Sequence, residues 1–524
     1  MATEDPLASL LDEGLAAQRG GRDALALAAF ERCFDASPAH AAAHLHAALS
    51  SYRLGRWEMG LAHARVAAAR EPQGALAWAR MARGLRALGR AAQAQVAAQR
   101  ALALEPRLAD AWSVLGLVAQ DAGDFDAARA AHRRALENDP RDAEARMDLA
   151  LCDEAQGDLD AALEGFREAA ALDPALADVP YNRGHLQHVR AGRIDAAIAS
   201  YREAIAMRPG FAQAHHNLAH ALFLSGDFPA AWREYRWRPP RLRYEAHERA
   251  AGRAYALPDP ASLAGARLRI VGEQGLGDTL FFLRFAPLLR AKGAVLEFAG
   301  DPRLASLLAR TGLFDSVDAA AEDARGVPAV LAGDLPELLA EAGTGGAPPP
   351  LVLVPDPGRV ARARERLDAL GPAPHVALAW RAGIAQGGAH ETLHKELPVG
   401  IFGKALAGMR ATWISVQREP RAGETEALSR HAGAAVHDLS GINEDLEDAL
   451  AYMSVLGGWI GVSNTNVHLR AATGGAALVL VPFPPEWRWM AAGDSPWFPG
   501  MRVYRQEAGG SWDGALARLA AGLP

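Results

Sequence analysis

The chain has 524 residues, of which half are apolar and 22% are charged. This is an ordinary globular composition, and the length is too great for one hydrophobic core, so we expect at least two domains. The net charge of −7 argues against a general affinity for nucleic acid. Cys33 and Cys152 are too few for a disulfide framework. The N-terminus has no signal-like apolar stretch, and no apolar run approaches the roughly 20 residues that span a bilayer. We therefore expect a cytoplasmic protein without a membrane span.

The first half of the chain is an internal repeat. Prolines recur every 34 residues, and the last of the series comes one residue late: Pro38, Pro72, Pro106, Pro140, Pro174 and Pro209. A period of 34 is the signature of tetratricopeptide repeats, which are pairs of antiparallel helices. Turns such as "QDAGDFDAA" place Gly after the first helix and Asp before the second, as helix capping requires.

The residues that fill the repeats agree with the period. Trp78, Trp112 and Tyr181 supply the large residue of the first helix, each 28 positions before a repeat proline. Small residues occupy the position where the two helices touch: Ala94, Ala128, Ala162 and Ala197. A further unit at 211–235 ends at Pro239 and Pro240. Residues 1–238 are thus predicted to form an all-α solenoid of six to seven repeats, and 239–264 a linker.

Stacked repeats of this kind form a groove that holds an extended peptide or a partner protein. Repeats alone are most often scaffolds. His216 and His220 have the i,i+4 spacing of two metal ligands, but no third ligand is near in the sequence, and groove or solvent positions are favoured.

From about residue 260, short β-rich runs alternate with helical patterns. The runs are "RLRIVG", "AVLEFAG", "PAVLAGD", "LVLVP", "HVALAW", "ATWISVQ", "WIGVS" and "ALVLVP". Strands alternating with helices predict parallel sheets covered on both faces. A loop at 341–350 divides the region, so we predict two Rossmann-like lobes at 265–350 and 351–524. Ligands bind such sheets at the carboxyl ends of the strands.

A glycine-rich turn follows the first predicted strand. Gly272, Gly275 and Gly277 precede Asp278 and a long apolar segment. The order differs from the dinucleotide fingerprint G-x-G-x-x-G, which disfavours an oxidoreductase. The glycines still allow a ligand to approach the backbone at a helix N-terminus. Asp278 is also an ideal N-cap for the next helix, and the spacing alone favours that interpretation.

The stretch "GEQGLGDTLFFLRFAPLLRAKGA" resembles the first strand, loop and helix of bacterial tetratricopeptide–glycosyltransferase fusions. More distantly it is similar to the lipopolysaccharide heptosyltransferases of the GT-B fold. The resemblance implies an α/β GT-B-like domain in which Asp278 is the catalytic base, since an Asp at this position can accept a proton from an acceptor hydroxyl. It also implies that 265–350 is the acceptor side and 351–524 the nucleotide-sugar side.

The second predicted lobe supports the resemblance. Lys395 lies just before Leu397 and Pro398, and matches a lysine that contacts the donor phosphate, although Leu397 replaces the usual Trp. A cation is needed there because the leaving diphosphate gains charge during transfer. Gln417 and Arg418 match the strand end that holds the nucleotide base. Each of these residues could equally belong to an ordinary loop or strand exit.

Trp380 ends a strand and could line the cleft. His390 and His394 have metal-ligand spacing, but hydrogen-bonding or structural roles are favoured in their Gly-rich loop. There is no D-x-D motif in a metal-binding context. The resemblance therefore implies a metal-independent enzyme without a cofactor, whose nucleotide-sugar donor is a substrate.

The stretch "GWIGVSNTNVHLRAATGGAALVLVPF" is similar to the diphosphate-binding element of the same fold. His468 matches the family's His. Ser463, Asn464 and Thr465 form the turn that begins the helix and directs N–H groups toward an anion. Ser463 stands where the family has Asp and Asn464 where it has Thr, which puts the usual phosphate and ribose contacts in doubt. For His468 the alternative is a buried core histidine.

The C-terminal segment is rich in tryptophan and proline. Trp487, Trp489 and Trp497 could stack on a sugar or base, but packing between the lobes is the favoured interpretation.

The combined interpretation is a glycosyltransferase that moves a sugar from a nucleotide-sugar to a Ser or Thr hydroxyl of a protein chosen by the repeats. Flagellin is the first guess for the acceptor, because fusions of this type include flagellin glycosyltransferases. The domain order is also similar to that of O-linked N-acetylglucosamine transferases. Two alternatives remain: a glycosyltransferase acting on a glycolipid or saccharide, and a non-catalytic scaffold, for which Ser463 in place of Asp is the best support.

Overall fold

The computed structural model describes residues 6–318, 327–341, 346–382 and 395–522. By its internal contacts the chain divides into two compact units, 1–186 and 187–524. The first is helical throughout its described part, and the second holds parallel sheets as well as helices. This order, a helical repeat region followed by an α/β region, confirms the fold class predicted from the sequence.

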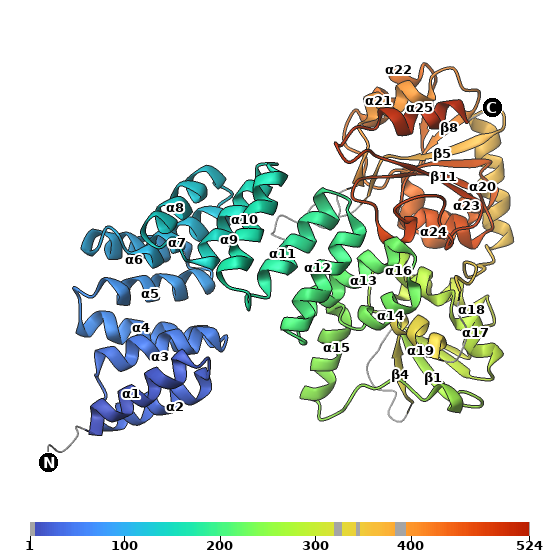
Figure 1. Ribbon diagram of the computed structural model, residues 1–524. Helices are drawn as coiled ribbons and strands as arrows, with labels where there is room; N and C mark the ends of the chain where they lie inside the picture. The colour runs from blue at the N-terminus through green and yellow to red at the C-terminus, as the bar shows by residue number, and fades with distance from the viewer. Residues whose placement is uncertain (1–5, 319–326, 342–345, 383–394, 523–524) are drawn as a thin grey trace, which may run out of the picture. The chain divides into compact units, whose positions relative to one another are not determined.

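Unit 1 consists of helices that pair antiparallel and stack on the next pair, as the blue and teal part of Figure 1 shows. They are α1 (Pro6–Arg19), α2 (Asp23–Ala36), α3 (Ala41–Arg53), α4 (Trp57–Arg70), α5 (Ala75–Ala87), α6 (Ala91–Leu104), α7 (Ala109–Asp121), α8 (Phe125–Asn138), α9 (Ala143–Ala155), α10 (Leu159–Leu172) and α11 (Asp178–His185). Ala94, Ala128 and Ala162 are fully buried where paired helices meet, as predicted.

The turn inside each repeat depends on a left-handed glycine. Glycines with φ between 62° and 88° recur at 21, 55, 89, 123 and 157, then at 192 and 226. The spacing is 34 except between Gly157 and Gly192, where it is 35. In that interval Leu186–Arg190 forms a π-helical turn, which accommodates one more residue than the α-helix does. The late Pro209 therefore marks an inserted residue and leaves the repeat pattern unbroken.

In three repeats of unit 1 an aromatic residue of the first helix is hydrogen-bonded to the loop before it. Ring nitrogens of His44, Trp78 and Trp112 each lie 3.0 Å from the carbonyl oxygen of the repeat proline six positions earlier. The aromatic residue thus caps the incoming loop with a hydrogen bond while its ring packs against the helices.

Unit 2 begins with the last repeat helices. They are α12 (Ile194–Met207), α13 (Ala212–Ser225), α14 (Phe228–Tyr235) and α15 (Pro239–Ala250). Helix α15 lies within the segment 239–264 that the sequence suggested as a linker, and it starts at the two prolines because proline is well suited to the first helical turn. The last repeats therefore belong to the same compact unit as the sheets.

A four-stranded parallel sheet comes next, in the order β3-β2-β1-β4. Its strands are β1 (Arg267–Val271), β2 (Val295–Ala299), β3 (Ser316–Asp318) and β4 (Ala329–Leu331). Its helices are α16 (Leu276–Leu283), α17 (Ala286–Ala291), α18 (Ala305–Ala309) and α19 (Leu335–Glu341).

The second sheet is six-stranded and parallel, in the order β12-β11-β10-β5-β8-β9. Its strands are β5 (His375–Ala379), β8 (Thr412–Ser415), β9 (Val436–Asp438), β10 (Gly458–Val462), β11 (Ala477–Val481) and β12 (Met501–Arg505). A separate two-stranded antiparallel pair joins β6 (Arg381–Ala382) and β7 (Lys395–Glu396). Renumbered from β5, the six-stranded order is 3-2-1-4-5-6, the doubly wound order of dinucleotide-binding domains.

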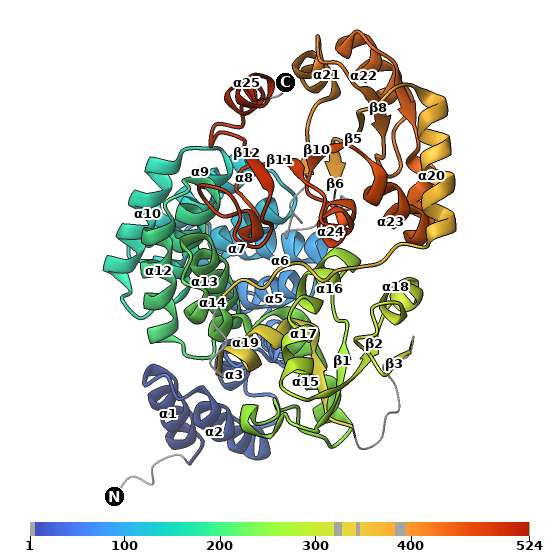
Figure 2. The same cartoon turned by 90° about the vertical axis from the view of Figure 1, so that its right-hand side faces the viewer.

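Helices cover both faces of the six-stranded sheet, as Figures 1 and 2 show. One face carries α21 (Val399–Leu406), α22 (Glu424–Ala432) and α25 (Asp513–Ala521), whose apolar residues share a core with Leu378 and Trp413. Along the other side α20 (Pro357–Leu370) packs on α23 (Leu446–Val455), and α23 packs on α24 (Thr465–Ala472). Burial on both faces explains why these strands are continuous apolar runs in the sequence.

One predicted strand is wrong. "LVLVP" at 351–355 joins no sheet: Leu351 and Leu353 are buried, Val352 and Val354 are exposed, and the Leu353 N–H donates to the Ala472 carbonyl. The alternation reflects an extended segment lying along the protein surface. The edge strands β3, β9 and β12 went unnoticed in the sequence because they are short or partly exposed.

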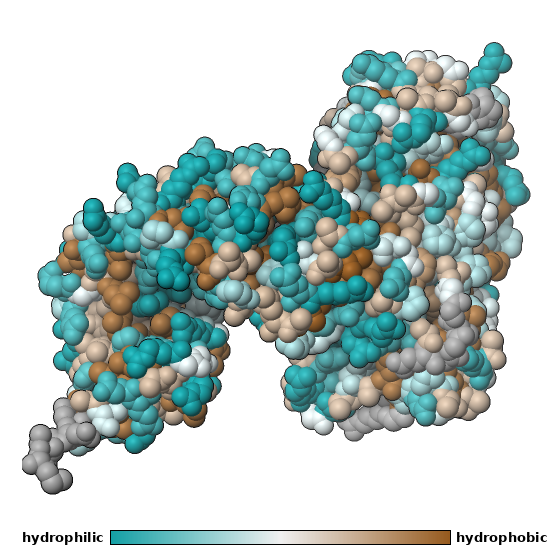
Figure 3. Space-filling model, viewed as in Figure 1, coloured by the Kyte–Doolittle hydropathy of each residue, from teal (hydrophilic) through white to brown (hydrophobic). Residues whose placement is uncertain are grey.

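No helix in the described ranges is long and apolar enough to cross a membrane. In the view of Figure 3 the surface of unit 1 is mostly polar, with apolar side chains in small patches. Its exposed large apolar residues are Leu25, Leu54, Met59 and Val96.

Candidate functional site

In unit 2 the fold brings together the segments that follow β1 and β10. In a doubly wound sheet, ligands bind beyond the carboxyl ends of the strands where the strand order reverses. In the six-stranded sheet that point lies between β5 and β10. The helix after β10, α24, packs against α16, the helix after β1 of the other sheet. The residues gathered around this contact, which we call the interlobe site, are Asp278, Lys395, His468, Glu486 and Arg488.

Asp278 lies in the first turn of α16. The helix begins at Leu276 with Gly275 as its N-cap, so the interpretation of Asp278 as the N-cap is wrong by three residues. The Asp278 carboxylate instead accepts a hydrogen bond from Nη2 of Arg488. About a third of the Asp278 side chain is exposed (33%), whereas the Arg488 side chain is 7% exposed. Asp278 is thus an accessible carboxylate held by a buried cation.

Arg488 links Asp278 to a second ion pair. Its Nη1 donates to Glu486, and the other oxygen of Glu486, Oε2, accepts from Lys395 Nζ at 2.5 Å. Lys395 Nζ also lies 3.2 Å from the Ser463 carbonyl oxygen. The charges alternate along the series Asp278, Arg488, Glu486 and Lys395, so each cation has a carboxylate neighbour.

Burial and pairing act in opposite directions on these groups. Burial would raise the pKa of the Glu486 carboxyl, but Lys395 and Arg488 outweigh it and hold that pKa well below its usual range. Burial would likewise lower the pKa of Arg488, but Asp278 and Glu486 raise it above its ordinary value. Glu486 and Arg488 therefore stay ionised at any physiological pH.

Aromatic rings surround the Arg488 guanidinium. Its central carbon lies 4.8 Å from the centre of the Phe281 ring and 4.6 Å from that of Trp487. Trp487 stacks on Phe223 of α13 at 4.2 Å, which joins the last repeat to the interlobe site. Such cation–π contacts position the guanidinium. Its Nε is buried and has no hydrogen-bond partner among the described residues.

His468 is buried beside the glycine turn. A Cβ at Gly277 would lie 3.1 Å from the His468 ring, so glycine permits the close approach of α16 and α24. Phe498 packs edge-on to the imidazole at 5.4 Å. Burial, and then the nearby Arg488, hold the pKa of His468 well below its usual value. His468 is therefore a neutral imidazole at the lobe contact.

The turn before α24 is less open than the sequence predicted. Asn464 is the N-cap of α24, and its side chain accepts from the N–H groups of Asn466 at 3.0 Å and Val467 at 3.4 Å. Ser463 is buried, and Thr465 is half-buried at the first position of the helix. The N–H groups expected to face an anion are thus partly occupied by the protein itself.

Gln417 and Trp380 are committed to the protein interior. The Gln417 amide accepts from the N–H groups of Trp380 and Arg381 and donates to the carbonyls of Arg381 and Arg418. These four bonds use the full capacity of the amide. Trp380 is fully buried, so its ring does not line an open surface. Both residues brace the end of β5.

Arg418 is exposed, with its side chain 73% accessible and 3.5 Å from Glu419. A pocket of about 370 Å³ is lined by the loop after β8, by α22 and by β9, and Arg418 is not among its lining residues. Its lining includes Pro420, Gly423, Thr425, Ser429, Val436 and Asp438.

The remaining predicted residues are readily placed. Gly272 follows β1 directly and Gly275 caps α16. Trp487, Trp489 and Trp497 are buried, in keeping with a packing role. His390 and His394 lie outside the described residues. In the described ranges no three His, Cys, Asp or Glu side chains form a group able to hold a metal ion, and metal independence stays a prediction.

Sequence reasoning missed Glu486 and Arg488. Both stand in "PPEWRW", where the tryptophans drew attention and the charged residues between them did not. It also missed that the last repeat lies close to the interlobe site. His216 and His220 of α13 are 4.5 Å apart between ring centres, and Tyr235 lies about as far from each, at 6.1 and 6.3 Å. Burial, His216, His188 and then Arg488 hold the pKa of His220 well below its usual value.

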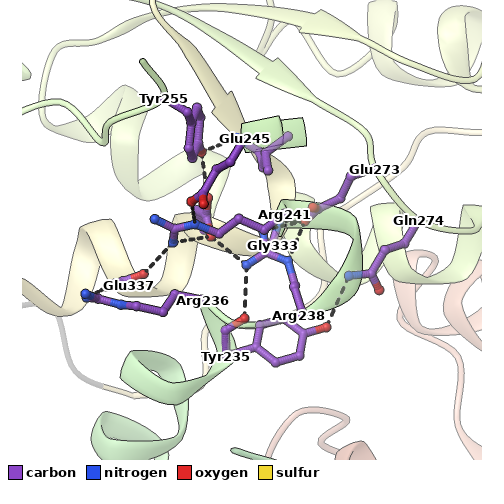
Figure 4. A network of polar contacts seen from close by, with 12 residues as sticks. Tyr235, Arg236, Arg238, Arg241, Glu245, Tyr255, Glu273, Gln274, Gly333 and Glu337 are labelled. Carbon is purple, nitrogen blue, oxygen red and sulfur yellow. Dashed lines mark hydrogen bonds and ion pairs between the residues drawn. The ribbon is translucent and has the colours of Figure 1, made fainter. Parts of the chain in front are cut away.

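A second arginine cluster lies at the carboxyl ends of β1 and β4 (Figure 4). Arg238, just before α15, donates to Glu273 at 2.7 Å and to Asp334 at 2.6 Å. Arg241 of α15 lies 3.1 Å from both Asp334 and Glu337. We call these five residues the Arg238 network. Because Arg238 fills the point where the four-stranded sheet reverses its order, the network joins α15 to this sheet.

Comparison with known proteins supports the repeat assignment. Residues 113–177 match a tetratricopeptide repeat family, and 187–226 match another described as TPR repeat. The chain therefore carries tetratricopeptide repeats. It is 28% identical over 284 residues to Protein FlbA of Caulobacter vibrioides, an alignment that covers 50% of this chain and 47% of that protein. The chain thus spans about half the length of this curated relative.

Solved structures resemble parts of the chain at low overall similarity. The Cut9–Hcn1 hetero-tetramer structure is 20% identical, with 41% of this chain and 42% of that chain covered and a TM-score of 0.37. A thermophilic TPR protein of Thermus thermophilus is 26% identical, with 33% of this chain and 94% of that chain covered and a TM-score of 0.31.

Proposed function

We propose that the protein is a metal-independent glycosyltransferase. It moves a sugar from a nucleotide-sugar to a Ser or Thr hydroxyl of a protein acceptor, for which flagellin is the first candidate. In this proposal Asp278 is the base, Lys395 and His468 lie on the donor side, and the repeats select the acceptor.

The observation that carries the proposal is the position of the Asp278 carboxylate, where a helix from each of the two parallel-sheet lobes meets the other. Asp278 projects from the first helix after β1, opposite the first helix after β10, and about a third of its side chain is exposed. A carboxylate with this access can accept the proton of an acceptor hydroxyl as its oxygen attacks the sugar. Lys395 and Arg488, on the other side, would stabilise the negative charge that grows on the leaving diphosphate.

The last repeat supports a protein acceptor. Helix α13 contacts the Trp487–Trp489 turn, so a repeat surface ends beside the interlobe site. Tyr235, the last residue of α14, accepts a hydrogen bond from Gln274 in the loop before Asp278 at 3.2 Å. A chain segment held by α13 and α14 would be delivered close to the base. Stacked repeats are well suited to binding an extended segment.

The pocket lined by the loop after β8, by α22 and by β9 is the candidate position for the nucleotide base. Arg418 lies in the chain just before Pro420, the first lining residue. Since Gln417 uses its hydrogen bonds on the backbone, we assign it to shaping the strand end rather than to recognising the base.

The test uses the full chain. A thermal-shift screen of UDP-, GDP-, ADP- and CMP-sugars identifies the donor, and transfer of labelled sugar to purified flagellin is then followed by mass spectrometry. We expect stabilisation by one nucleotide class and labelled Ser or Thr residues. A donor that binds while label passes only to lipid or saccharide would favour the glycolipid alternative.

A non-catalytic scaffold is the second candidate. It is favoured by the pairing of both site cations with Glu486 and of Arg488 with Asp278, which leaves neither cation uncompensated. No thermal shift with any nucleotide-sugar, at concentrations up to millimolar, would support the scaffold over the enzyme.

A further inference from the structure

Glu486 occupies an unusual position for a carboxylate. Each of its two oxygens accepts from a different cation, Oε1 from Arg488 and Oε2 from Lys395. Its side chain is 14% exposed, and that of Lys395 is 16% exposed, so the pair is largely buried but still in contact with solvent. Charge-assisted hydrogen bonds from two cations to one anion are an arrangement with which proteins bind carboxylate and phosphate groups alike.

Glu486 and Asp278 together do not balance the positive charge around them. Arg284, which is 2% exposed, donates to backbone carbonyls, including that of Trp497 at 2.5 Å, and within the described ranges it makes no ion pair with a carboxylate. Burial, and then the neighbouring Arg488, lower the pKa of Arg284 to about 9. Arg284, Lys395 and Arg488 thus bring three positive charges, against the two carboxylates of Asp278 and Glu486.

Arg488 also has unused hydrogen-bonding capacity. Its Nε is buried and unpaired among the described residues, although its two terminal nitrogens donate to carboxylates. A buried N–H without a partner is unfavourable, because it has lost its hydrogen bond to water and gained none in the protein. A ligand oxygen that reached the guanidinium could relieve that cost, which the small carboxylate of Glu486 does not.

We propose that Glu486 holds the place of a diphosphate on Lys395 and Arg488, and that a diphosphate ligand binds by displacing it. The inference rests on the proposed function in taking the ligand to be the diphosphate of a donor. Glu486 is then an internal competitor: it keeps two cations in position in the empty site and weakens the binding of any anion that must replace it.

A competing role of Glu486 and a purely structural role predict opposite effects on anion binding when its charge is removed. If Glu486 only orients Lys395 and Arg488, removing its charge disorders the cations and weakens anion binding. If Glu486 competes with the ligand, removing its charge strengthens binding. Glu486→Gln keeps the size and one acceptor oxygen of the side chain while removing the charge.

The probe is inorganic pyrophosphate, because it carries the diphosphate without a base or sugar. Calorimetry on the full chain should show pyrophosphate binding at least 10-fold more tightly to Glu486→Gln than to the wild type. Adding Lys395→Ala to that variant should abolish the gain. Glu396→Gln is the matched control: it removes one charge from the adjacent position of β7, whose carboxylate bonds Arg421 at 2.9 Å, and should bind pyrophosphate as the wild type does.

Unchanged or weaker pyrophosphate binding by Glu486→Gln would overturn the proposal, as would an equal gain in Glu396→Gln. If Glu486→Gln does not fold, Glu486→Asp keeps the charge but is one methylene too short to bridge both cations. It should bind pyrophosphate roughly 3-fold more tightly, and no gain would again overturn the proposal.

The outcome separates this inference from the proposed function. Tighter pyrophosphate binding by Glu486→Gln, with no nucleotide-sugar bound, would leave the displacement standing and remove the transferase. Sugar transfer by the wild type, with no gain in Glu486→Gln, would remove the displacement alone.

Discussion

Two arginine clusters in unit 2 are built from the same chemistry and differ in access to water. Arg238 holds Glu273 and Asp334, and all three side chains are nearly inaccessible, at 1%, 6% and 1%. Arg488 holds Asp278 and Glu486, but here the carboxylates are 33% and 14% exposed. Each arginine lies at the carboxyl ends of parallel strands, where fold topology alone would suggest a ligand site in both.

Topology alone thus suggests a ligand position in both sheets, and the burial of the side chains there decides whether a ligand can reach it. The Arg238 network fills its switch point with the protein's own groups and joins α15 to the four-stranded sheet. In the interlobe site the Asp278 carboxylate is accessible, and Lys395 is in contact with solvent. A buried ion network stabilises only while every member is paired, whereas an accessible one can exchange a protein partner for a ligand.

The sharpest test of the comparison removes the buried cation. Arg238→Met leaves Glu273 and Asp334 buried without their main partner, and we expect a loss of about 3–5 kcal/mol in the free energy of unfolding. Calorimetric melting of the full chain measures it. Arg243→Met, on the exposed side of α15, is the control and should be nearly silent. A loss below about 1 kcal/mol for Arg238→Met would show that the network does not hold the unit together.

The accessible carboxylate should behave in the opposite way. Asp278→Asn keeps an oxygen that can accept from Arg488, so it should lower the melting temperature only slightly and leave donor affinity nearly unchanged. Transfer should fall by roughly 100-fold or more, since an amide cannot accept the proton. Single-turnover transfer assays with the cognate donor measure the loss. A folded Asn variant that still transfers at close to the wild-type rate would exclude Asp278 as the base.

A carboxylate with no ion pair completes the comparison. Asp148 of α9 is 8% exposed, and no ion pair within the described ranges includes it. Burial, and then Glu144, raise its pKa to about 7, against the lowering influence of Arg86 and Arg83. The unfolded chain therefore ionises at lower pH than the folded one, and the folded state loses stability as the pH rises from about 4 to about 7.

Asp148→Asn should consequently stabilise the protein by roughly 2 kcal/mol at pH 8 and by almost nothing near pH 3 (roughly one unit below the ordinary pKa of Asp), where the carboxyl is mostly protonated in both the folded and the unfolded chain. Melting curves at the two pH values measure the difference. Asp160→Asn, at an exposed position of α10, is the control. Equal effects of Asp148→Asn at both pH values would contradict a raised pKa.

The smallest expected effects concern the donor side. Lys395→Ala and His468→Ala should each weaken binding of the cognate nucleotide-sugar by roughly 10-fold, as the loss of one charged or polar contact does. Lys395→Arg should recover only part, because a planar fork replaces a point charge. Calorimetry measures both. Unchanged affinity in the two alanine variants would remove them from the site.

The sequence by itself determined the repeats and most of the strands, since both depend on local periodicity. The 34-residue spacing places a left-handed glycine and a small helix-contact residue in every repeat, and the late Pro209 already marks the inserted residue that the structure forms into a π-turn. Likewise Gly272–Asp278 could be recognised as a strand–loop–helix element, because its glycines and its apolar flanks are neighbours in the chain.

Only the tertiary structure decided what the charged residues do. Arg488 meets Asp278 across 210 positions, and Lys395 meets Glu486 across 91. Arg238 reaches Asp334 across 96. No local pattern specifies such pairs, because an ion pair depends on where two separate elements come to lie and on how much water remains between them. Burial makes Arg238 structural, and partial exposure makes Asp278 a candidate base. Both properties arise from the packing of the unit and cannot be read from either residue in the sequence.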